Sequence, residues 1–156
     1  MHPGLDSLTS TGFTVDTPSH TIRFIRRFAA PRDQVFTAWT QPQHVTAWWD
    51  PTGEPLVRCE IDLRVGGNFI FVSGAHADMP FSGKYREISP PERLVFEAMG
   101  AEGRVILAAA EGGTLMTVEI ACASPEHLEQ FVNMGVAAGT SRTLDNLVSH
   151  LGSGPG

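Results

Sequence analysis

The sequence has few cysteines, few basic residues and no long apolar run, and each shortage excludes a class of protein. Two cysteines in 156 residues cannot form a disulfide framework, so Cys59 and Cys122 are predicted to be buried free thiols in a reducing compartment. The 11 Lys and Arg are outnumbered by 17 Asp and Glu, and the net charge of -6 argues against binding nucleic acid or an anionic membrane surface. No transmembrane helix or signal peptide is recognisable. We therefore expect a cytoplasmic protein that does not insert into membranes.

The compact motifs that mark metal, nucleotide or nucleophile sites are also missing. The six histidines form no H-x-H or H-E-x-x-H motif and no Cys/His pair at zinc spacing. Neither a G-x-S-x-G elbow, a phosphate-binding loop nor a dinucleotide fingerprint occurs. We therefore predict no metal, no cofactor and no catalytic residue, which favours a binding protein over an enzyme.

The composition along the chain indicates one domain. Residues 1–19 are rich in Thr, Ser, Gly and Pro without periodicity, which predicts a flexible leader. Residues 152–156 form a Gly-rich stretch that predicts a disordered tail. The domain is expected to span residues 20–151, because neither a repeat nor a linker interrupts that region.

Most of the domain has the period of two that is typical of strands. Thr21–Ala29 is rich in β-branched and aromatic residues and predicts the first strand. Two short helices are expected next, at Pro31–Trp39 and from Pro42 onward. Six more strands follow, at Leu56–Asp62, Gly67–Ser73, Phe81–Ile88, Arg93–Met99, Arg104–Ala110 and Thr114–Ala121. Because their connections are too short for parallel crossovers, the seven strands are predicted to be antiparallel.

A long amphipathic helix is predicted after the last strand. Ser124 can cap its first turn, Pro125 suits its first position, and no clear stop signal precedes Gly152. The expected helix runs from Pro125 to Leu151. Helix and sheet must each bury an apolar face, and they do so most simply against each other. This predicts an α+β helix-grip fold, with a seven-stranded curved antiparallel sheet around one long C-terminal helix and two short helices between strands one and two.

The alternation predicts an inner sheet face that is aromatic and nearly uncharged, opposite a helix that is thin at its centre. Gly135 and Gly139 each cost a helix about 1 kcal/mol relative to alanine. Two interpretations stay open: close approach of the helix backbone to a strand, or space kept for an apolar ligand. On the second interpretation the ligand-binding residues are Trp49, Phe69, Phe71, Tyr85, Phe96, Met116, Val118, Phe131, Gly135 and Gly139.

Other residues near this space have two interpretations each. His76 and Asp78 lie in a loop at the predicted rim, where they are either an acid–base pair or, more simply, part of a solvated loop. Glu97 is either a buried carboxylate or part of a half-solvated outer face. Trp48 and Trp49 are either core residues or a gate to the cavity.

Six segments, taken in order, resemble one known family. They are APRDQVFTAWT at 30–40, WWDP at 48–51, RVGGNF at 64–69, GKYREISPPERLVF at 83–96, GTL at 113–115 and MGVAAG at 134–139. They resemble the activator of heat-shock-protein-90 ATPase homologue-like domains of the START-related (SRPBCC, birch-pollen-allergen-like) superfamily, over about residues 21–151. The resemblance implies the same helix-grip fold. One departure is Asp50, where the family usually has glycine, so Asp50 either reshapes the cavity mouth or caps a turn.

The resemblance leaves several functions open. The wider superfamily binds lipids, hormones and polyketides, includes some cyclases and hydroxylases, and has a co-chaperone as its eukaryotic name-giver. We predict that this chain, as a monomer or homodimer, binds a small hydrophobic molecule between sheet and helix. The alternatives are a chaperone-linked interaction protein of the ATPase-activator kind, and a cofactor-free cyclase or hydrolase using His76, Asp78 or Glu97.

Overall fold

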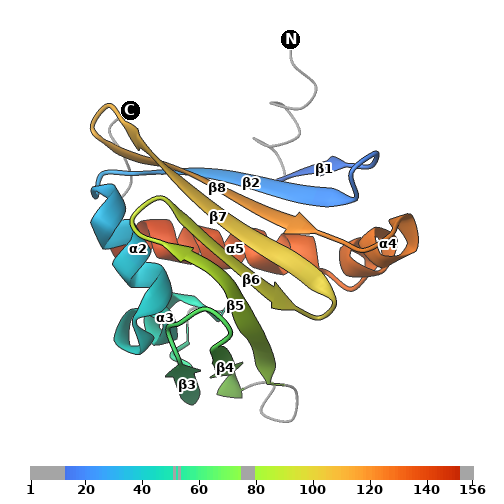
Figure 1. Cartoon of the computed structure of the whole chain (residues 1–156), viewed down its shortest axis with the longest axis horizontal. Coiled ribbons are helices and arrows are strands. Elements are labelled where there is room, and N and C mark those ends of the chain that lie inside the picture. The colour runs from blue at the N-terminus through green and yellow to red at the C-terminus, as the bar shows by residue number, and fades with distance from the viewer. Residues whose placement is uncertain (1–12, 51, 53, 75–79, 152–156) are drawn as a thin grey trace.

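One antiparallel sheet curves across a C-terminal helix in the computed structural model, which describes residues 13–50, 52, 54–74 and 80–151 (Figure 1). The strand order is β1-β2-β8-β7-β6-β5-β4-β3, and every neighbouring pair is antiparallel. The strands are β1 (Thr14–Asp16), β2 (Thr21–Phe28), β3 (Arg58–Ile61), β4 (Asn68–Val72), β5 (Phe81–Ser89), β6 (Arg93–Ala98), β7 (Ala101–Ala110) and β8 (Gly113–Ala121). The predicted α+β class and antiparallel connectivity are therefore confirmed.

The described residues form eight strands, so the expected number of seven was too low. The additional strand is β1, which lies within the segment expected to be a flexible leader and pairs with β2 through Thr14↔Arg23 and Asp16↔Thr21. A strand of three residues is too short to show a period of two, and only its pairing with β2 defines it. The sequence signal for this strand was absent for that reason.

The turn between β6 and β7 shows how a strand boundary was misplaced. Residues 100–103 were expected to form a loop because two glycines flank it, yet β7 begins at Ala101. The turn consists of Met99 and Gly100, with φ angles of 55° and 78°. Two consecutive left-handed residues are what a tight two-residue hairpin requires, so the chain reverses without a longer loop.

Two short helices fill one end of the sheet's concave face, as predicted. α2 (Arg32–Thr40) contacts β7 and β8, and α3 (Pro42–Trp48) contacts β3 and the C-terminal helix. Only Gln41 separates them, and its extended backbone ends one helix and begins the next. No helix in the described part of the chain is long and apolar enough to cross a membrane.

The C-terminal helix is interrupted, so the prediction of one unbroken helix from Pro125 to Leu151 was wrong. The structure has α4 (Pro125–Asn133) and α5 (Val136–Leu151) instead. Gly135 has a φ of 80°, and its amide donates to the Val132 carbonyl at 3.1 Å. Glycine in this left-handed conformation is the commonest way for a helix to end. The long helix α5 nevertheless lies along the sheet as expected (Figure 1).

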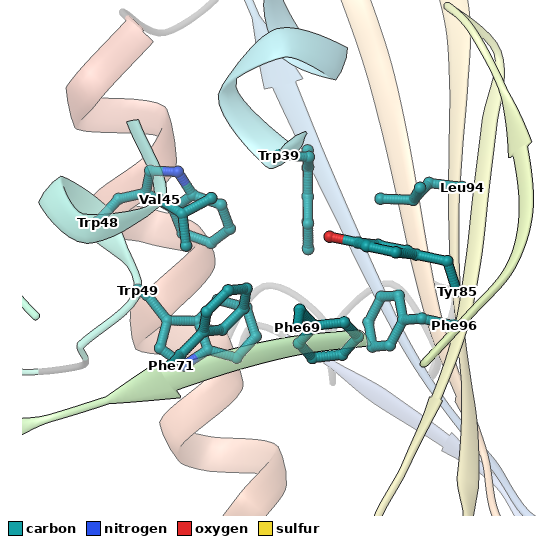
Figure 2. Close-up of a pocket in the computed structure, with 9 residues that line it drawn as sticks. All are labelled: Trp39, Val45, Trp48, Trp49, Phe69, Phe71, Tyr85, Leu94 and Phe96. Atoms are coloured by element: carbon teal, nitrogen blue, oxygen red, sulfur yellow. The ribbon is translucent and has the colours of Figure 1, made fainter. Parts of the chain in front are cut away.

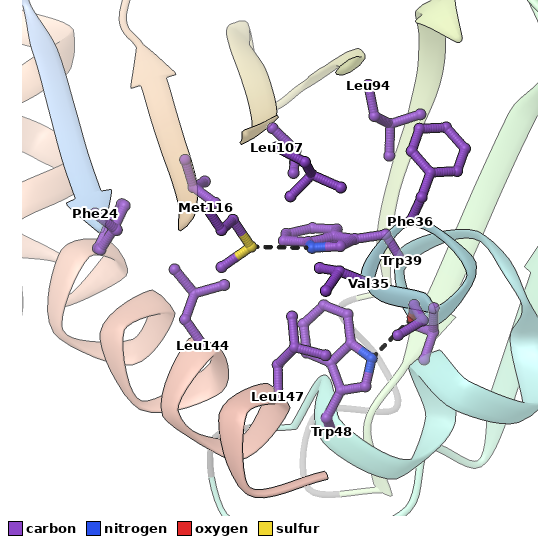
Figure 3. Packing of buried hydrophobic residues seen from close by; sticks show 14 of the residues in the cluster. Phe24, Val35, Phe36, Trp39, Trp48, Leu94, Leu107, Met116, Leu144 and Leu147 are labelled. Atoms are coloured by element: carbon purple, nitrogen blue, oxygen red, sulfur yellow. Dashed lines mark hydrogen bonds between the residues drawn. The ribbon is translucent and has the colours of Figure 1, made fainter. Parts of the chain in front are cut away.

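The core lies where α2, α3 and α5 meet the concave face of the sheet (Figure 3). Trp48 has no exposed surface, and its ring lies 4.9 Å from that of Trp39 in an edge-on arrangement. Trp39 donates from Nε1 to the Met116 sulfur at 3.3 Å, so an α2 side chain is tied to β8. These contacts hold α2 and α3 against the concave face of the sheet.

Candidate functional site

A cavity of about 420 Å³ lies between the sheet and the segment formed by α4 and α5. This volume falls within the range typical of small-molecule sites. Its lining contains no charged side chain; it consists of Trp39, Trp49, Phe81, Phe96, Ala98, Met99, Ala101, Gly103, Val118, Ile120, Phe131, Met134, Gly135, Val136, Gly139, Thr140, Thr143 and Leu144.

Small side chains on β6 and β7 leave room for the cavity on the concave side of the sheet. Ala98 on β6 is paired with Ala101 on β7, and Gly103 is paired with Phe96. A Cβ atom on Gly103 would lie 2.5 Å from the Phe96 ring, so only glycine allows that ring to lie across β7. The ring therefore forms one edge of the cavity while the neighbouring alanines leave its middle open.

On the helix side of the cavity, Gly135 and Gly139 add no side chain, and the structural reason differs between them. Gly135 lines the cavity at the break between α4 and α5, and a Cβ atom there would meet nothing within 4 Å. Close approach of the backbone to a strand therefore does not explain Gly135; its left-handed φ does. Gly139 lies within α5, where its amide donates to the Gly135 carbonyl at 2.9 Å, and it faces the cavity without a side chain.

Two exposed methionines and a histidine contact mark the outer end of the cavity. Met99 and Met134 line the cavity and are 51% and 65% exposed. His127 on α4 accepts the Ala123 amide at Nδ1, at 3.0 Å, so its proton lies on Nε2 and is donated to the Met99 carbonyl at 3.1 Å. This contact ties α4 to the β6–β7 turn and holds the outer end of the cavity in place.

The structure brings together six of the ten predicted binding residues. Trp49, Phe96, Val118, Phe131, Gly135 and Gly139 line the cavity of 420 Å³. Phe69, Phe71 and Tyr85 lie outside it, around a second space of about 10 Å³ that also touches Trp39, Trp49 and Phe96 (Figure 2). Met116 is fully buried and packs against Trp39. The residues predicted to face inward therefore do so. Phe69, Phe71 and Tyr85, however, fill their part of the concave face and do not line the larger cavity.

Several cavity residues were missed by the sequence reasoning. Ala98 and Ile120 stand on strand faces that the alternation already places inward, so that signal was present. Ala101 and Gly103 were missed because they were assigned to a loop rather than to β7. Thr140, Thr143 and Leu144 follow Gly139 along the cavity side of α5, at spacings that the helical period would have revealed.

Of the three polar candidates, only Glu97 lies in the described part of the chain, and it does not line the cavity. Glu97 is exposed on the outer face and pairs with Arg86 at 3.0 Å, so it is not a buried carboxylate. His76 and Asp78 lie outside the described residues. Within the described part of the chain, no group of three or more potential ligands could hold a metal ion. The described lining of the cavity carries no acidic, basic or histidine side chain.

Both cysteines are free, as predicted, but only Cys122 is buried as expected, whereas Cys59 is half-buried. Burial raises the pKa of the Cys59 thiol to about 11 and also raises the pKa of Cys122. Because the thiolate is the reactive form of cysteine, burial lowers the reactivity of both thiols.

Asp50 caps a turn rather than lining the cavity. Its Oδ1 accepts from the amide of Thr52 at 2.9 Å, and its Oδ2 accepts from the Ser73 hydroxyl at 2.6 Å. Its carbonyl accepts from Asn146 of α5 at 2.9 Å. The Asp50 side chain is thus buried among donors that join the end of α3 to the end of β4.

Replacing Asp50 should destabilise the domain. We expect Asp50→Ala to lower the free energy of unfolding by about 1–3 kcal/mol, because Thr52 and Ser73 lose the charged acceptor that they share. Urea denaturation measures this change. The control is Asp62→Ala, which removes an exposed ion pair with Arg64 and should cost less than about 0.5 kcal/mol. Equal effects of the two substitutions would contradict the structural role of Asp50.

Solved structures of similar shape are known from several bacteria. A protein from Nitrosomonas europaea has a TM-score of 0.76 at 23% identity, with 84% of this chain and 93% of that chain covered. An AHSA1-like protein from Aeromonas hydrophila has a TM-score of 0.70 at 23% identity, covering 83% and 90% of the two chains. CalU16 from Micromonospora echinospora has a TM-score of 0.61 at 28% identity, covering 85% and 76%. These likenesses support the fold.

The sequence itself identifies the family, although the search of curated proteins found no match. The family model described as "Activator of Hsp90 ATPase homolog 1-like protein" matches residues 29–152, which is most of the chain. Together with the fold, this match is consistent with the SRPBCC/START-like superfamily. The chain therefore belongs to the Activator of Hsp90 ATPase homolog 1-like family.

Proposed function

We propose that this protein binds a small hydrophobic molecule in the cavity between the sheet and the α4–α5 segment. The observation that carries the proposal is a space of about 420 Å³ whose lining is almost wholly apolar. A core at ordinary packing density leaves few voids larger than a water molecule, so a space of this size needs an explanation. Transfer of apolar ligand surface from water would supply the driving force.

Two features of the lining support a ligand over a packing defect. Thr143, one of two threonines in the lining, donates its hydroxyl to the Trp49 carbonyl at 3.0 Å, so this group is already paired. The outer end is formed by exposed methionines, whose flexible side chains can adapt to an incoming molecule. The cavity is therefore poorly suited to hold ordered water and well suited to apolar groups.

Ligand binding should stabilise the protein and alter its tryptophan fluorescence. A panel of fatty acids, flavonoids and aromatic polyketides would be screened by thermal shift. A ligand at 100 times its Kd adds about 2.7 kcal/mol of stability, which raises Tm by several degrees. Trp39 and Trp49 line the cavity, so the same ligand should change their emission. A crystal structure in which side chains fill this space would remove the proposal.

A second candidate function is activation of a chaperone ATPase, which is supported by the description of the family. It predicts that the purified protein stimulates the ATPase of an Hsp90-type chaperone at equimolar or higher concentration. An ATPase rate that stays unchanged at saturating protein would remove this candidate. Ligand binding and ATPase activation are measured independently, so one result does not decide the other.

A further inference from the structure

The hydroxyl of Tyr85 borders a small space lined by apolar side chains. Tyr85 is 2% exposed and projects from β5 into the space that Figure 2 shows, with its oxygen directed toward Trp39. Among the described residues, none makes a hydrogen bond to this hydroxyl, and Trp39 donates instead to the Met116 sulfur. A phenolic O–H without a protein partner can donate to a molecule that enters the space beside it.

The space in front of the hydroxyl could hold one water molecule or one ligand atom of similar size. Its volume is about 10 Å³, and its walls come only from apolar and aromatic side chains besides Tyr85 itself. Three of those side chains, Trp39, Trp49 and Phe96, also line the cavity of 420 Å³. The small space therefore lies next to the large cavity, with these three side chains shared between them.

The chemistry of the surroundings limits what can enter. Burial raises the pKa of Tyr85, so the group is a protonated O–H donor at neutral pH. No cation lines either space, so a carboxylate or phosphate would be desolvated there without compensation. A neutral oxygen acceptor meets both conditions.

We propose, on the basis of the proposed function, that the ligand is a neutral and mostly apolar molecule with a terminal carbonyl oxygen that accepts a hydrogen bond from Tyr85. The apolar body occupies the cavity of 420 Å³, and the oxygen occupies the small space between Trp39 and Phe96. Tyr85 then determines which apolar molecules are preferred, because a site built to donate a hydrogen bond disfavours the analogue that lacks the acceptor.

The test compares two probes of nearly the same shape, naphthyl methyl ketone and isopropenylnaphthalene, on the full-length protein. The ketone has an oxygen where the hydrocarbon has a methylene group. Native protein should bind the ketone about tenfold more tightly than the hydrocarbon, as measured by tryptophan fluorescence or calorimetry. In Tyr85→Phe this preference should disappear, while the Kd of the hydrocarbon stays unchanged. The Tm of unliganded Tyr85→Phe should equal or exceed that of native protein, since no protein partner is lost.

The outcomes separate this inference from the proposed function. If both probes bind native protein equally and Tyr85→Phe changes neither Kd, the partner of Tyr85 is water and the inference is overturned while the cavity proposal stands. If Tyr85→Phe weakens both probes alike, the residue shapes the cavity without selecting a carbonyl, and the inference is again overturned. If neither probe binds native protein at its solubility limit, the cavity proposal fails together with the inference.

Discussion

Gly139→Leu is expected to weaken binding of apolar ligands by more than tenfold while leaving the protein at least as stable as the native form. Gly139 lies inside α5 and lines the cavity without a side chain. Leucine would extend into the space that the ligand needs, and it favours a helix over glycine by about 0.8–1 kcal/mol. A substitution that abolished binding by unfolding the protein would also lower its stability, so the opposite signs of these two effects are diagnostic. Ligand Kd and urea denaturation measure them separately.

The matched control for this prediction is Gly139→Ala. Alanine supplies the helix propensity with only one methyl group, so stability should rise by about 1 kcal/mol while the ligand Kd changes little. A Gly139→Leu protein that binds ligand as tightly as native protein would show that the ligand lies elsewhere. A strongly destabilised Gly139→Leu protein would show that the space beside α5 is not open.

Trp48→Ala should cost about 3–5 kcal/mol of unfolding free energy, a large part of the stability of a typical domain. Trp48 is fully buried, and its ring contacts those of Trp39 and Trp49. Its Nε1 donates to the Ala38 carbonyl at 3.0 Å, which satisfies one of the last carbonyls of α2. The substitution therefore leaves a cavity and an unpaired carbonyl together. Urea or thermal denaturation measures the loss.

The control for Trp48 is an exposed apolar residue. Val57 is 65% exposed, so Val57→Ala should change stability by less than about 0.5 kcal/mol. Trp48→Phe should give an intermediate loss, because it keeps part of the ring but cannot donate to Ala38. If Trp48→Ala were as mild as Val57→Ala, Trp48 would be a mobile gate rather than a core residue. The two interpretations of the tryptophan pair are thus separated by one measurement.

The strands and their inward faces could be predicted because they depend on local sequence. Phe69 and Phe71 alternate with polar or less buried neighbours, and both are buried as expected. The same alternation placed Val118 and Met116 inward on β8. A period of two is a property of one strand alone, so it needs no knowledge of the rest of the chain.

The break at Gly135 was predictable in principle but was not predicted. Gly135 is a typical signal for the end of a helix. The apolar spacing nevertheless continues on both sides of Gly135, in α4 and in α5. The apolar spacing favours a single long helix, whereas the left-handed φ of Gly135 ends α4. β1 is the opposite case, since its three residues carry no signal of their own.

The sequence alone determined seven of the eight described strands, the two short helices and the apolar face of the sheet, because helical and strand periods depend on neighbouring residues. Only the tertiary structure decided where the concave face is filled and where it is hollow. Phe69, Phe71 and Tyr85 fill one part of that face, while Ala98 and Gly103 on the sheet and Gly139 on the facing helix leave another part open. Whether a space remains depends on the summed volumes of side chains from distant segments, and that sum exists only once the chain has folded.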